Sequence, residues 1–370
     1  MELIYLANLR LPTEKAHGIQ IMKMCQALAL TGLEVELIVP WRFNKIKKDP
    51  FDYYGIKKNF KIRKLPSLDL VGKISRLGFW IQNMTFALSI FFYLLFRKTD
   101  YIYSRNLFSL WILSFFKKNL IYEAHSFPEH FWLYQSTLKR IKGLIIITQK
   151  LKEFYQKKGI AQGKILVAPD GVDLEEFNIK ESKEECRRKL NLPLDRKIIG
   201  YVGQLKTMGI EKGIADLIKA TRIVGHALCL VGGQQSDIME YKKLTRGLDI
   251  IFVGQIQHKL IPCYLKSFDV LVMPFPWTEH YAYYMSPLKM FEYMAAQKPI
   301  VASNLPSIRE ILDKNNAILV QLDSPQRLAR GIEMALENTD LAAKISRQAF
   351  KDVGKYTWSK RADNIIKFIS

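Results

Sequence analysis

Short runs of apolar residues recur along the chain and are separated by segments of helical length. The runs are rich in Ile, Leu and Val, which is typical of buried parallel strands in β-α-β units. The strands predicted in the first half are Leu3–Ala7, Glu34–Val39, Lys61–Leu65, Tyr101–Ser104, Leu120–Glu123, Leu144–Thr148 and Ile165–Ala168. Those predicted in the second half are Ile198–Val202, Ala227–Val231, Ile250–Val253, Val270–Met273, Ile300–Ala302 and Ala317–Val320. Two such sets predict an α/β chain with two Rossmann-like, doubly wound domains.

A polar segment separates the two sets of strands. Asn178–Arg196 is dense in charged side chains, so we expect it to connect the domains. The length of 370 residues also suits two domains. Beyond the second set, apolar periodicity predicts three helices, Ser324–Glu337, Leu341–Val353 and Trp358–Ile369.

One segment is apolar enough to need a membrane check. Leu77–Phe96 is close to the roughly 20 residues that a spanning helix needs. Four polar residues interrupt it, namely Gln82, Asn83, Thr85 and Ser89, and a predicted strand follows almost at once. We therefore expect a buried or surface-docked helix rather than a membrane span.

The chain is strongly basic, with 56 Lys and Arg against 35 Asp and Glu and a formal net charge of +21. Residues 51–150 alone hold 16 basic and 5 acidic side chains. A basic surface attracts nucleic acid, an anionic membrane or phosphorylated ligands, and charge alone does not choose among them.

Cysteine usage argues against disulfides and metal sites. The four cysteines are scattered, and none lies in a C-x-x-C pair or in a Cys/His set with zinc spacing. We therefore expect reduced thiols in a reducing compartment and no bound metal. The opening residues show no basic and apolar pattern of a signal peptide, which fits that expectation.

Candidate binding residues in the first half follow predicted strands. Lys15, His17 and Gly18 lie on the loop before a helix expected near Ile19, where backbone amides suit an anion or a sugar hydroxyl. His125 follows the strand that ends at Glu123, and ligands of open α/β sheets bind at such ends. An ordinary turn and a histidine satisfied within the fold explain these residues equally well.

Two further loops in the second half suit a phosphorylated ligand. The loop Gly203–Gly213 follows a strand and carries Lys206 and Lys212, although it matches neither the dinucleotide fingerprint nor the P-loop. In the run Ser286–Ala295, a proline opens a predicted helix that Ser286 could cap. Glu292 falls inside that helix, where a carboxylate could accept both hydroxyls of a ribose.

Together these segments resemble the retaining glycosyltransferases of family 4 (glycosyl transferases group 1) in their Ser-Pro-Leu-Lys variety. The resemblance covers nearly the whole chain. Its most specific motif is Ser286-Pro-Leu-Lys-Met-Phe-Glu-Tyr-Met-Ala295. The other matching segments are Lys15–Gly18, Tyr122–His125, Ala168–Asp173 with Phe177, Tyr201–Leu205, Glu211–Gly213, Pro299–Ser303 and Tyr356–Trp358.

The resemblance implies the GT-B fold, in which two Rossmann-like domains face a cleft. Residues 1–175 would form the acceptor-side domain and 176–355 the domain that binds the nucleotide-sugar donor. The last helix, 356–370, would pack back on the first domain. The implied catalytic residues are His125, which would touch the transferred sugar, and Glu292, which would bind the donor ribose.

The resemblance also assigns the remaining site residues. Gly18 would lie under the donor diphosphate, and Lys15 and His17 would belong to the acceptor side. Lys212, assisted by Lys206, would meet the diphosphate. The implied donor-binding set is Gly18, Gln204, Lys206, Lys212, Tyr284, Ser286, Pro287, Leu288, Lys289 and Glu292.

Three departures from the family pattern leave the donor and the orientation of its sugar open. Tyr284 occupies the position of the first Glu in the family's E-x7-E motif, although Glu279 lies nearby. Gln204 replaces a basic residue, and about three extra residues separate Gly203 from Lys212. The Ser-Pro-Leu-Lys variety often lacks the first Glu, so we interpret its absence as a subfamily trait.

The function implied is metal-independent transfer, with retention, of a hexose or related sugar from a UDP- or GDP-linked donor to a glycan or lipid-linked acceptor. No Asp-x-Asp triplet is present to hold a metal, and no cofactor is expected. Two alternatives share the fold: a nucleotide-sugar epimerase and a non-catalytic sugar-nucleotide binding protein. Nucleic-acid binding rests on charge alone, without a matching motif, so we expect no nucleic-acid partner.

The basic first half suggests where such an enzyme would work. Many acceptors of this family are lipid-linked, and an anionic bilayer attracts basic side chains. We expect a cytoplasmic protein attached peripherally to the inner face of the plasma membrane. The cluster that would attach it is Lys45, Lys47, Lys48, Lys57, Lys58, Lys61, Arg63, Lys64, Lys73 and Arg76.

Overall fold

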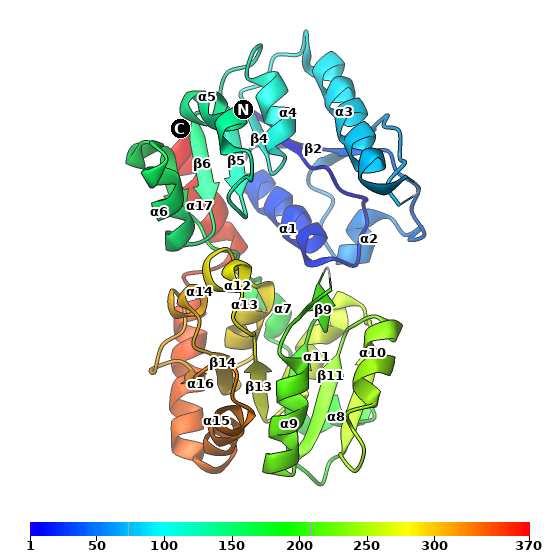
Figure 1. Cartoon of the computed structure of the whole chain (residues 1–370), viewed down its shortest axis with the longest axis vertical. Coiled ribbons are helices and arrows are strands. Elements are labelled where there is room, and N and C mark those ends of the chain that lie inside the picture. The colour runs from blue at the N-terminus through cyan, green and yellow to red at the C-terminus, as the bar shows by residue number, and fades with distance from the viewer. Residues whose placement is uncertain (73, 208) are drawn as a thin grey trace. The chain divides into compact units, whose positions relative to one another are not determined.

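The computed structural model describes residues 1–72, 74–207 and 209–370, apart from the side chains of residues 75 and 76. The chain forms two compact units (Figure 1). Unit 1 comprises Met1–Pro169 and Trp358–Ser370, and unit 2 comprises Asp170–Thr357. Lys73 and the side chain of Arg76, two members of the predicted basic cluster, lie outside the described residues.

Unit 1 contains a seven-stranded parallel sheet in the order β3-β2-β1-β4-β5-β6-β7. Its strands are β1 (Glu2–Leu6), β2 (Glu34–Pro40), β3 (Lys61–Leu65), β4 (Tyr101–Ser104), β5 (Leu120–Ala124), β6 (Gly143–Ile146) and β7 (Ile165–Val167). The order changes direction between β1 and β4, which makes their carboxyl ends the switch point where doubly wound sheets bind ligands.

The helices of unit 1 are α1 (Ala16–Leu30), α2 (Pro50–Tyr54), α3 (Ser75–Leu94), α4 (Leu107–Leu113), α5 (Phe131–Arg140), α6 (Gln149–Lys157) and α17 (Trp358–Ile369), with a 3₁₀ turn at Gln162–Lys164. The last helix, drawn in red in Figure 1, packs against α1 and β6. The end of the chain thus completes the unit in which the chain begins.

Unit 2 contains a six-stranded parallel sheet in the order β12-β11-β8-β13-β14-β15. Its strands are β8 (Ile198–Val202), β11 (Ala227–Val231), β12 (Ile250–Gly254), β13 (Val270–Met273), β14 (Ile300–Ser303) and β15 (Ile318–Val320). The switch point lies between β8 and β13. The two sheets confirm the predicted α/β class with two doubly wound, Rossmann-like domains.

The helices of unit 2 cover both faces of its sheet. They are α7 (Leu174–Phe177), α8 (Lys183–Lys189), α9 (Ile214–Val224), α10 (Gln235–Lys242), α11 (Ile261–Ser267), α12 (Glu279–Tyr283), α13 (Leu288–Ala295), α14 (Pro306–Arg309), α15 (Pro325–Glu337) and α16 (Thr339–Val353), with a 3₁₀ turn, η2, at His258–Leu260. A two-stranded hairpin, β9 (Lys206–Thr207) and β10 (Ile210–Glu211), was not predicted. It occupies the segment where the family comparison indicated extra residues.

The predicted connection Asn178–Arg196 is wrong, because this segment folds inside unit 2. Its charges are organised into α8, whose start is a capping box between Ser182 and Glu185. Arg187 is buried and donates to the carbonyl of Ser267 (2.8 Å) and to the carboxylate of Asp269 (2.6 Å). The chain passes between the units at Pro169 and Asp170 instead.

Helix α3 is long and apolar enough to cross a membrane by length and composition, with a mean hydropathy of 1.3 over Leu77–Leu94. However, 39% of that window is buried. The polar residues that interrupt it face inward, because the side chains of Gln82 and Asn83 both bond to that of Asn8 (2.9 and 2.7 Å). The structure thus gives a helix docked along unit 1 through one of its faces.

The two glycines that bound α9 provide a matched test of backbone constraint. Gly213 (φ +80°) and Gly225 (φ +74°) both adopt the left-handed conformation. A Cβ at Gly213 would lie 1.6 Å from the carbonyl oxygen of Pro274, whereas a Cβ at Gly225 would meet nothing within 4 Å.

We therefore expect Gly213→Ala to lower the free energy of unfolding by more than about 2 kcal/mol and Gly225→Ala by about 1 kcal/mol, since only the former adds a backbone collision to the left-handed strain. Urea denaturation followed by circular dichroism measures both losses. Equal losses of unfolding free energy in the two variants would show that the close approach of Pro274 does not restrict the residue at position 213.

Candidate functional site

Loops at the carboxyl end of the sheet in unit 2 converge at its switch point. Gly203 follows β8 and donates its backbone N–H to Val231 at the end of β11 (2.8 Å). The backbone of Gly213 lies directly against Pro274, which follows β13. These contacts place Gly203 and Gly213 at the carboxyl ends of the neighbouring strands β8 and β13, where α/β sheets bind ligands.

Lys289, on the first turn of α13, points into this region. Its Nζ is buried 3.7 Å from the ring centroid of Tyr201 and 5.4 Å from that of Phe275. Among the described residues it has no hydrogen-bond partner. Burial, followed by the nearby charge of Lys212, holds the pKa of Lys289 well below its usual range. A buried ammonium without a partner is costly unless an anion joins it.

Lys212 adds a second positive group. Burial lowers the pKa of Lys212 to about 8. The start of α13 adds partial charge, because its N-cap, Pro287, supplies no side-chain bond to the first N–H groups of the helix. Two desolvated amines and the open N-terminus of a helix together form a site suited to a phosphate or diphosphate.

Glu292 lies one turn further along α13 and is buried. Its Oε1 lies 3.2 Å from Nε2 of His258 in η2. The sequence prediction missed His258, although it stands shortly after the end of β12 much as His125 follows β5. The carboxylate of Glu292 therefore has a neighbour that fixes its position while leaving it able to accept further hydrogen bonds.

Ser286 has a different role from the predicted one. Its hydroxyl accepts a hydrogen bond from the backbone N–H of Asp170 (2.9 Å). The prediction that it caps the helix is wrong, because Pro287 is the N-cap residue and Leu288 the first residue of α13. Tying Ser286 to Asp170 leaves the first amides of α13 without a side-chain cap.

Three other predicted donor-binding residues have partners of their own. Lys206 lies in β9 and bonds both carboxylate oxygens of Glu240 (2.7 Å). The hydroxyl of Tyr284 donates to Glu279 (2.9 Å), and the carbonyl of Gln204 accepts from Tyr201 (2.8 Å). The charge of Lys206 is thus balanced, whereas Lys212 and Lys289 have no carboxylate partner of this kind among the described residues.

In unit 1, the candidate His125 belongs to a network of hydrogen bonds around Glu123 on β5. Its buried carboxylate accepts from Gln20 (2.8 Å) and from Arg361 of α17 (3.1 Å), and Nε2 of His125 lies 2.7 Å away. The hydroxyl of Tyr103 bonds to its other oxygen. Burial alone would raise the pKa of Glu123, but Arg361 and His125 outweigh it and hold that pKa well below its usual range.

This network fixes the ring of His125, which is partly exposed at the end of β5. The sequence prediction missed Glu123 and Arg361. Glu123 could have been found, because an acid inside a predicted buried strand is unusual. Nothing in the sequence reveals that the final helix brings Arg361 into contact with Glu123. His125 is the one candidate in unit 1 that the structure holds by a direct bond to a buried charge.

The other candidates in unit 1 lie at the start of α1. The prediction of a loop up to Ile19 is wrong, because α1 begins at Ala16 with Lys15 as an exposed N-cap. Gly18 is buried under Tyr54, whose hydroxyl would lie 2.2 Å from a Cβ. Burial, followed by the charge of Arg105, lowers the pKa of His17 to about 4, so its ring is neutral at pH 7.

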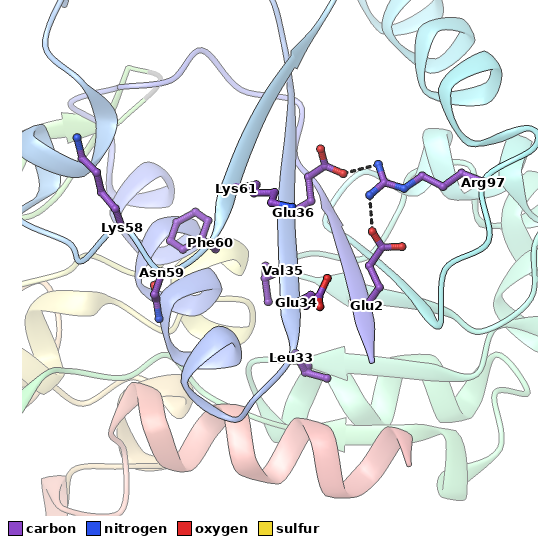
Figure 2. Close-up of a pocket in the computed structure, with 10 residues that line it drawn as sticks. All are labelled: Glu2, Leu33, Glu34, Val35, Glu36, Lys58, Asn59, Phe60, Lys61 and Arg97. Atoms are coloured by element: carbon purple, nitrogen blue, oxygen red, sulfur yellow. Dashed lines mark hydrogen bonds and ion pairs between the residues drawn. The ribbon is translucent and has the colours of Figure 1, made fainter.

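A cavity of about 440 Å³ lies at the other end of the unit 1 sheet. It surrounds the amino-terminal residues of β1, β2 and β3, and Arg97 there bonds to Glu2 and Glu36 (Figure 2). Doubly wound sheets bind substrates at the carboxyl ends of their strands, so this cavity is not the candidate site. Within the described ranges, no group of three or more His, Cys, Asp or Glu side chains could hold a metal ion.

The network around Glu123 makes a direct prediction. Glu123→Gln leaves the buried guanidinium of Arg361 without its counter-charge, so we expect a loss of about 3 kcal/mol or more of unfolding free energy at pH 7. Folding lowers the pKa of Glu123 below its ordinary value of 4.5. The ionised carboxylate therefore stabilises the folded protein fully at pH values above 4.5, and this stabilisation is lost as the pH falls through the pKa of the folded state.

Urea denaturation at pH 7 and at low pH measures this loss of unfolding free energy. The difference between Glu123→Gln and the unmodified protein should become smaller at low pH. Glu153→Gln is the control, since that carboxylate is exposed and pairs with Lys150 on the surface; we expect less than about 1 kcal/mol. A Glu123→Gln protein as stable as the control would contradict the central role of this charge.

Comparison with known proteins agrees with this geometry. Residues 182–352 match the family model described as Glycosyl transferases group 1. The putative teichuronic acid biosynthesis glycosyltransferase TuaC of Bacillus subtilis is 29% identical over 192 residues, covering 51% of this chain and 45% of TuaC. The chain spans about half the length of the first curated relatives that it matches.

Solved structures match over the whole length. Sucrose-phosphate synthase from Thermosynechococcus elongatus has a TM-score of 0.79 at 19% identity, covering 99% of this chain and 98% of the other. HepE of Anabaena, solved in complex with UDP-glucose, has a TM-score of 0.72 at 18% identity, covering 99% and 98%. The chain therefore has the GT-B fold, and residues 182–352, which lie within unit 2, match the model of the glycosyl transferases group 1.

Proposed function

We propose that this protein is a retaining glycosyltransferase of family 4, in its Ser-Pro-Leu-Lys variety. It moves a hexose or related sugar from a nucleotide-sugar bound by unit 2 to a glycan or lipid-linked acceptor. The observation that carries the proposal is the buried amine of Lys289 at the open start of α13, next to Lys212. The likeness in fold to HepE, which was solved with UDP-glucose, supports a donor of this class.

The positive groups of unit 2 suit the departure of a nucleoside diphosphate. Negative charge develops on the leaving phosphate as the glycosidic bond breaks. Lys289, Lys212 and the first amides of α13 are already in place, so stabilising that charge requires little reorganisation. We propose that these groups supply the positive charge that other enzymes obtain from a metal, so that transfer is metal-independent.

Glu292 is proposed to bind the ribose of the donor. Its carboxylate is buried, carries two acceptor oxygens and is oriented by His258. Two adjacent hydroxyls can donate to one carboxylate, which gives a contact specific for a nucleotide rather than for free phosphate. Binding energy at the ribose positions the reacting sugar without taking part in bond breaking.

For the sugar itself, we propose that His125 contacts the transferred group and that Lys15 and His17 serve the acceptor. The Nε2 of His125 lies 2.7 Å from the carboxylate of Glu123, which holds the ring in place. No carboxylate in the motif suits a covalent intermediate. We therefore propose front-face attack, in which the donor phosphate takes the acceptor proton.

The similarity to TuaC, whose name assigns it to teichuronic acid biosynthesis, supports an acceptor in cell-surface polysaccharide assembly. One observation favours a second candidate, a non-catalytic sugar-nucleotide binding protein. Tyr284 stands where the family pattern has a carboxylate, although its hydroxyl holds the carboxylate of Glu279 beside it. Donor hydrolysis or transfer distinguishes the two functions, because the second predicts binding without turnover.

A thermal-shift panel of UDP, GDP, ADP and their common sugars tests the donor site. A ligand at 100 times its Kd adds about 2.7 kcal/mol of stability, so one nucleotide should raise the melting temperature clearly. Glu292→Ala should remove most of that shift, because the ribose contact is lost. Glu337→Ala, an exposed glutamate of unit 2, is the control and should keep it. No shift with any nucleotide for well-folded protein would contradict the proposal.

Lys289→Met separates binding from folding. The substitution removes a buried, unpartnered amine but keeps the length of the side chain, so we expect unfolding free energy unchanged or higher. Affinity for the nucleotide should fall at least tenfold, since one charge-assisted contact contributes about 1.5–3 kcal/mol. Chemical denaturation and calorimetric titration give the two values. Unchanged affinity would mean that Lys289 does not meet the diphosphate.

A further inference from the structure

Helices α3 and α4 of unit 1 pack against each other (Figure 1). These helices and the residues just after α4 carry a continuous series of aromatic contacts. Ring centroids follow one another at 5.0–6.4 Å from one end of the series to the other. We call this series the aromatic ridge. Its members are Trp80, Phe108, Trp111, Phe115, Phe116, Phe91 and Phe92.

The ridge is largely open to solvent. Trp80 is 53% exposed, Phe92 68%, Phe115 60% and Phe116 59%. Other apolar side chains along the same helix are also exposed, namely Phe79, Met84 and Leu88, with Phe96 just beyond it. At about 150–250 Å² for a whole aromatic side chain, the four exposed rings of the ridge alone present an area comparable to the roughly 300–600 Å² of the largest apolar patch on an ordinary monomer, and such patches are often functional.

The opposite side of α3 is an ordinary core face. Phe86, Ile90 and Leu94 are buried, and Gln82 and Asn83 are bonded to Asn8. The helix is therefore correctly docked on unit 1, and its exposed face is a feature of the folded protein. Because the bonded side keeps its partners, the exposed side is available to contact an apolar environment without unfolding α3.

The charges around the ridge are mostly basic. Between residues 77 and 118 the chain has five basic residues and a single acid, Asp100, which accepts the backbone N–H of Glu2. Lys98 and Lys118 are exposed at the ends of α3 and α4. Arg140 of α5 lies 5.5 Å from the ring of Phe115. A protein partner could match an apolar face, but exposed apolar rings with an excess of cations beside them match the surface of an anionic bilayer.

The predicted basic cluster before α3 is partly used inside unit 1. Lys58 pairs with Asp49 (3.5 Å), and Arg63 pairs with the buried Glu36 (2.6 Å). That cluster therefore does not carry the argument for a membrane. The exposed rings and the cations beside them do.

We propose that the aromatic ridge is the surface by which unit 1 docks on an anionic membrane. The rings enter the interface between headgroups and acyl chains, Lys98, Lys118 and Arg140 contact the headgroups, and α3 lies along the membrane rather than across it. This inference does not depend on the proposed glycosyl transfer, because docking is measured without any substrate.

Flotation with vesicles tests the proposal on the full chain. We expect the protein to float with phosphatidylglycerol–phosphatidylcholine vesicles at moderate salt and to bind pure phosphatidylcholine vesicles at least tenfold less. Phe92→Ser combined with Phe115→Ser should lower binding to the anionic vesicles at least tenfold. Lys98→Gln combined with Lys118→Gln should lower it severalfold and weaken its dependence on salt.

Trp277→Ser is the matched control, since Trp277 of unit 2 is 54% exposed but lies outside the ridge; it should bind as the unmodified protein does. Circular dichroism and the nucleotide thermal shift verify that each variant is folded. Equal binding to both kinds of vesicle, or binding that the ridge substitutions leave unchanged, would overturn the proposal. So would a dimer in solution that the ridge substitutions dissociate while no vesicle is bound, because the ridge would then join two copies of the chain.

Discussion

The constraint around which the site of unit 2 is arranged is a buried amine, that of Lys289 at the start of α13, which has no hydrogen-bond partner in the part of the chain that the structure describes. Gly203 lies so close that a Cβ there would be 2.8 Å from its Nζ, and the ring of Tyr201 covers it from one side. Such an arrangement costs folding free energy, because the charged form is desolvated and unpaired. Proteins keep costs of this kind where function requires them, and a diphosphate provides the missing partner.

In unit 1, by contrast, the buried charge has hydrogen-bond partners. Glu123 is wholly enclosed, but Gln20, Arg361 and His125 surround its carboxylate. A compensated charge of this kind stabilises and orients its neighbours. We infer that Glu123 positions the side chains around it, whereas Lys289 binds a ligand.

The regular part of the fold was predictable from local sequence. Strands such as Ile198–Val202 and Ala227–Val231 have the bounds predicted from their apolar runs, because a parallel strand buried on both faces needs a continuous run. The hairpin β9–β10 was missed because strands of two residues leave no periodic pattern. The connection at Asn178–Arg196 was misplaced because a capping box turns a polar segment into a helix.

The site was predictable where a motif is contiguous and not where contacts are distant in sequence. The run from Ser286 to Glu292 marked α13, but the bond from Asp170 to Ser286 and the pairing of His258 with Glu292 depend on tertiary structure. The same holds for Arg361, which reaches Glu123 from the last helix. Burial of Lys289 could not be inferred from the motif, because it depends on the rings of Tyr201 and Phe275, which lie elsewhere in the sequence.

The most direct measurement of the central claim is the proton exchange that accompanies nucleotide binding. Burial lowers the pKa of Lys212 to about 8, so this amine is partly neutral at pH 8.5, and burial also holds the pKa of Lys289 well below its usual range. A bound diphosphate favours their charged forms and raises both pKa values, so binding must take up protons. Calorimetric titration in two buffers of different ionisation enthalpy should show net proton uptake at pH 8.5, with affinity falling as the pH rises from 7 to 9. Equal heats in both buffers and an affinity independent of pH would contradict the assignment of these buried amines to the donor diphosphate.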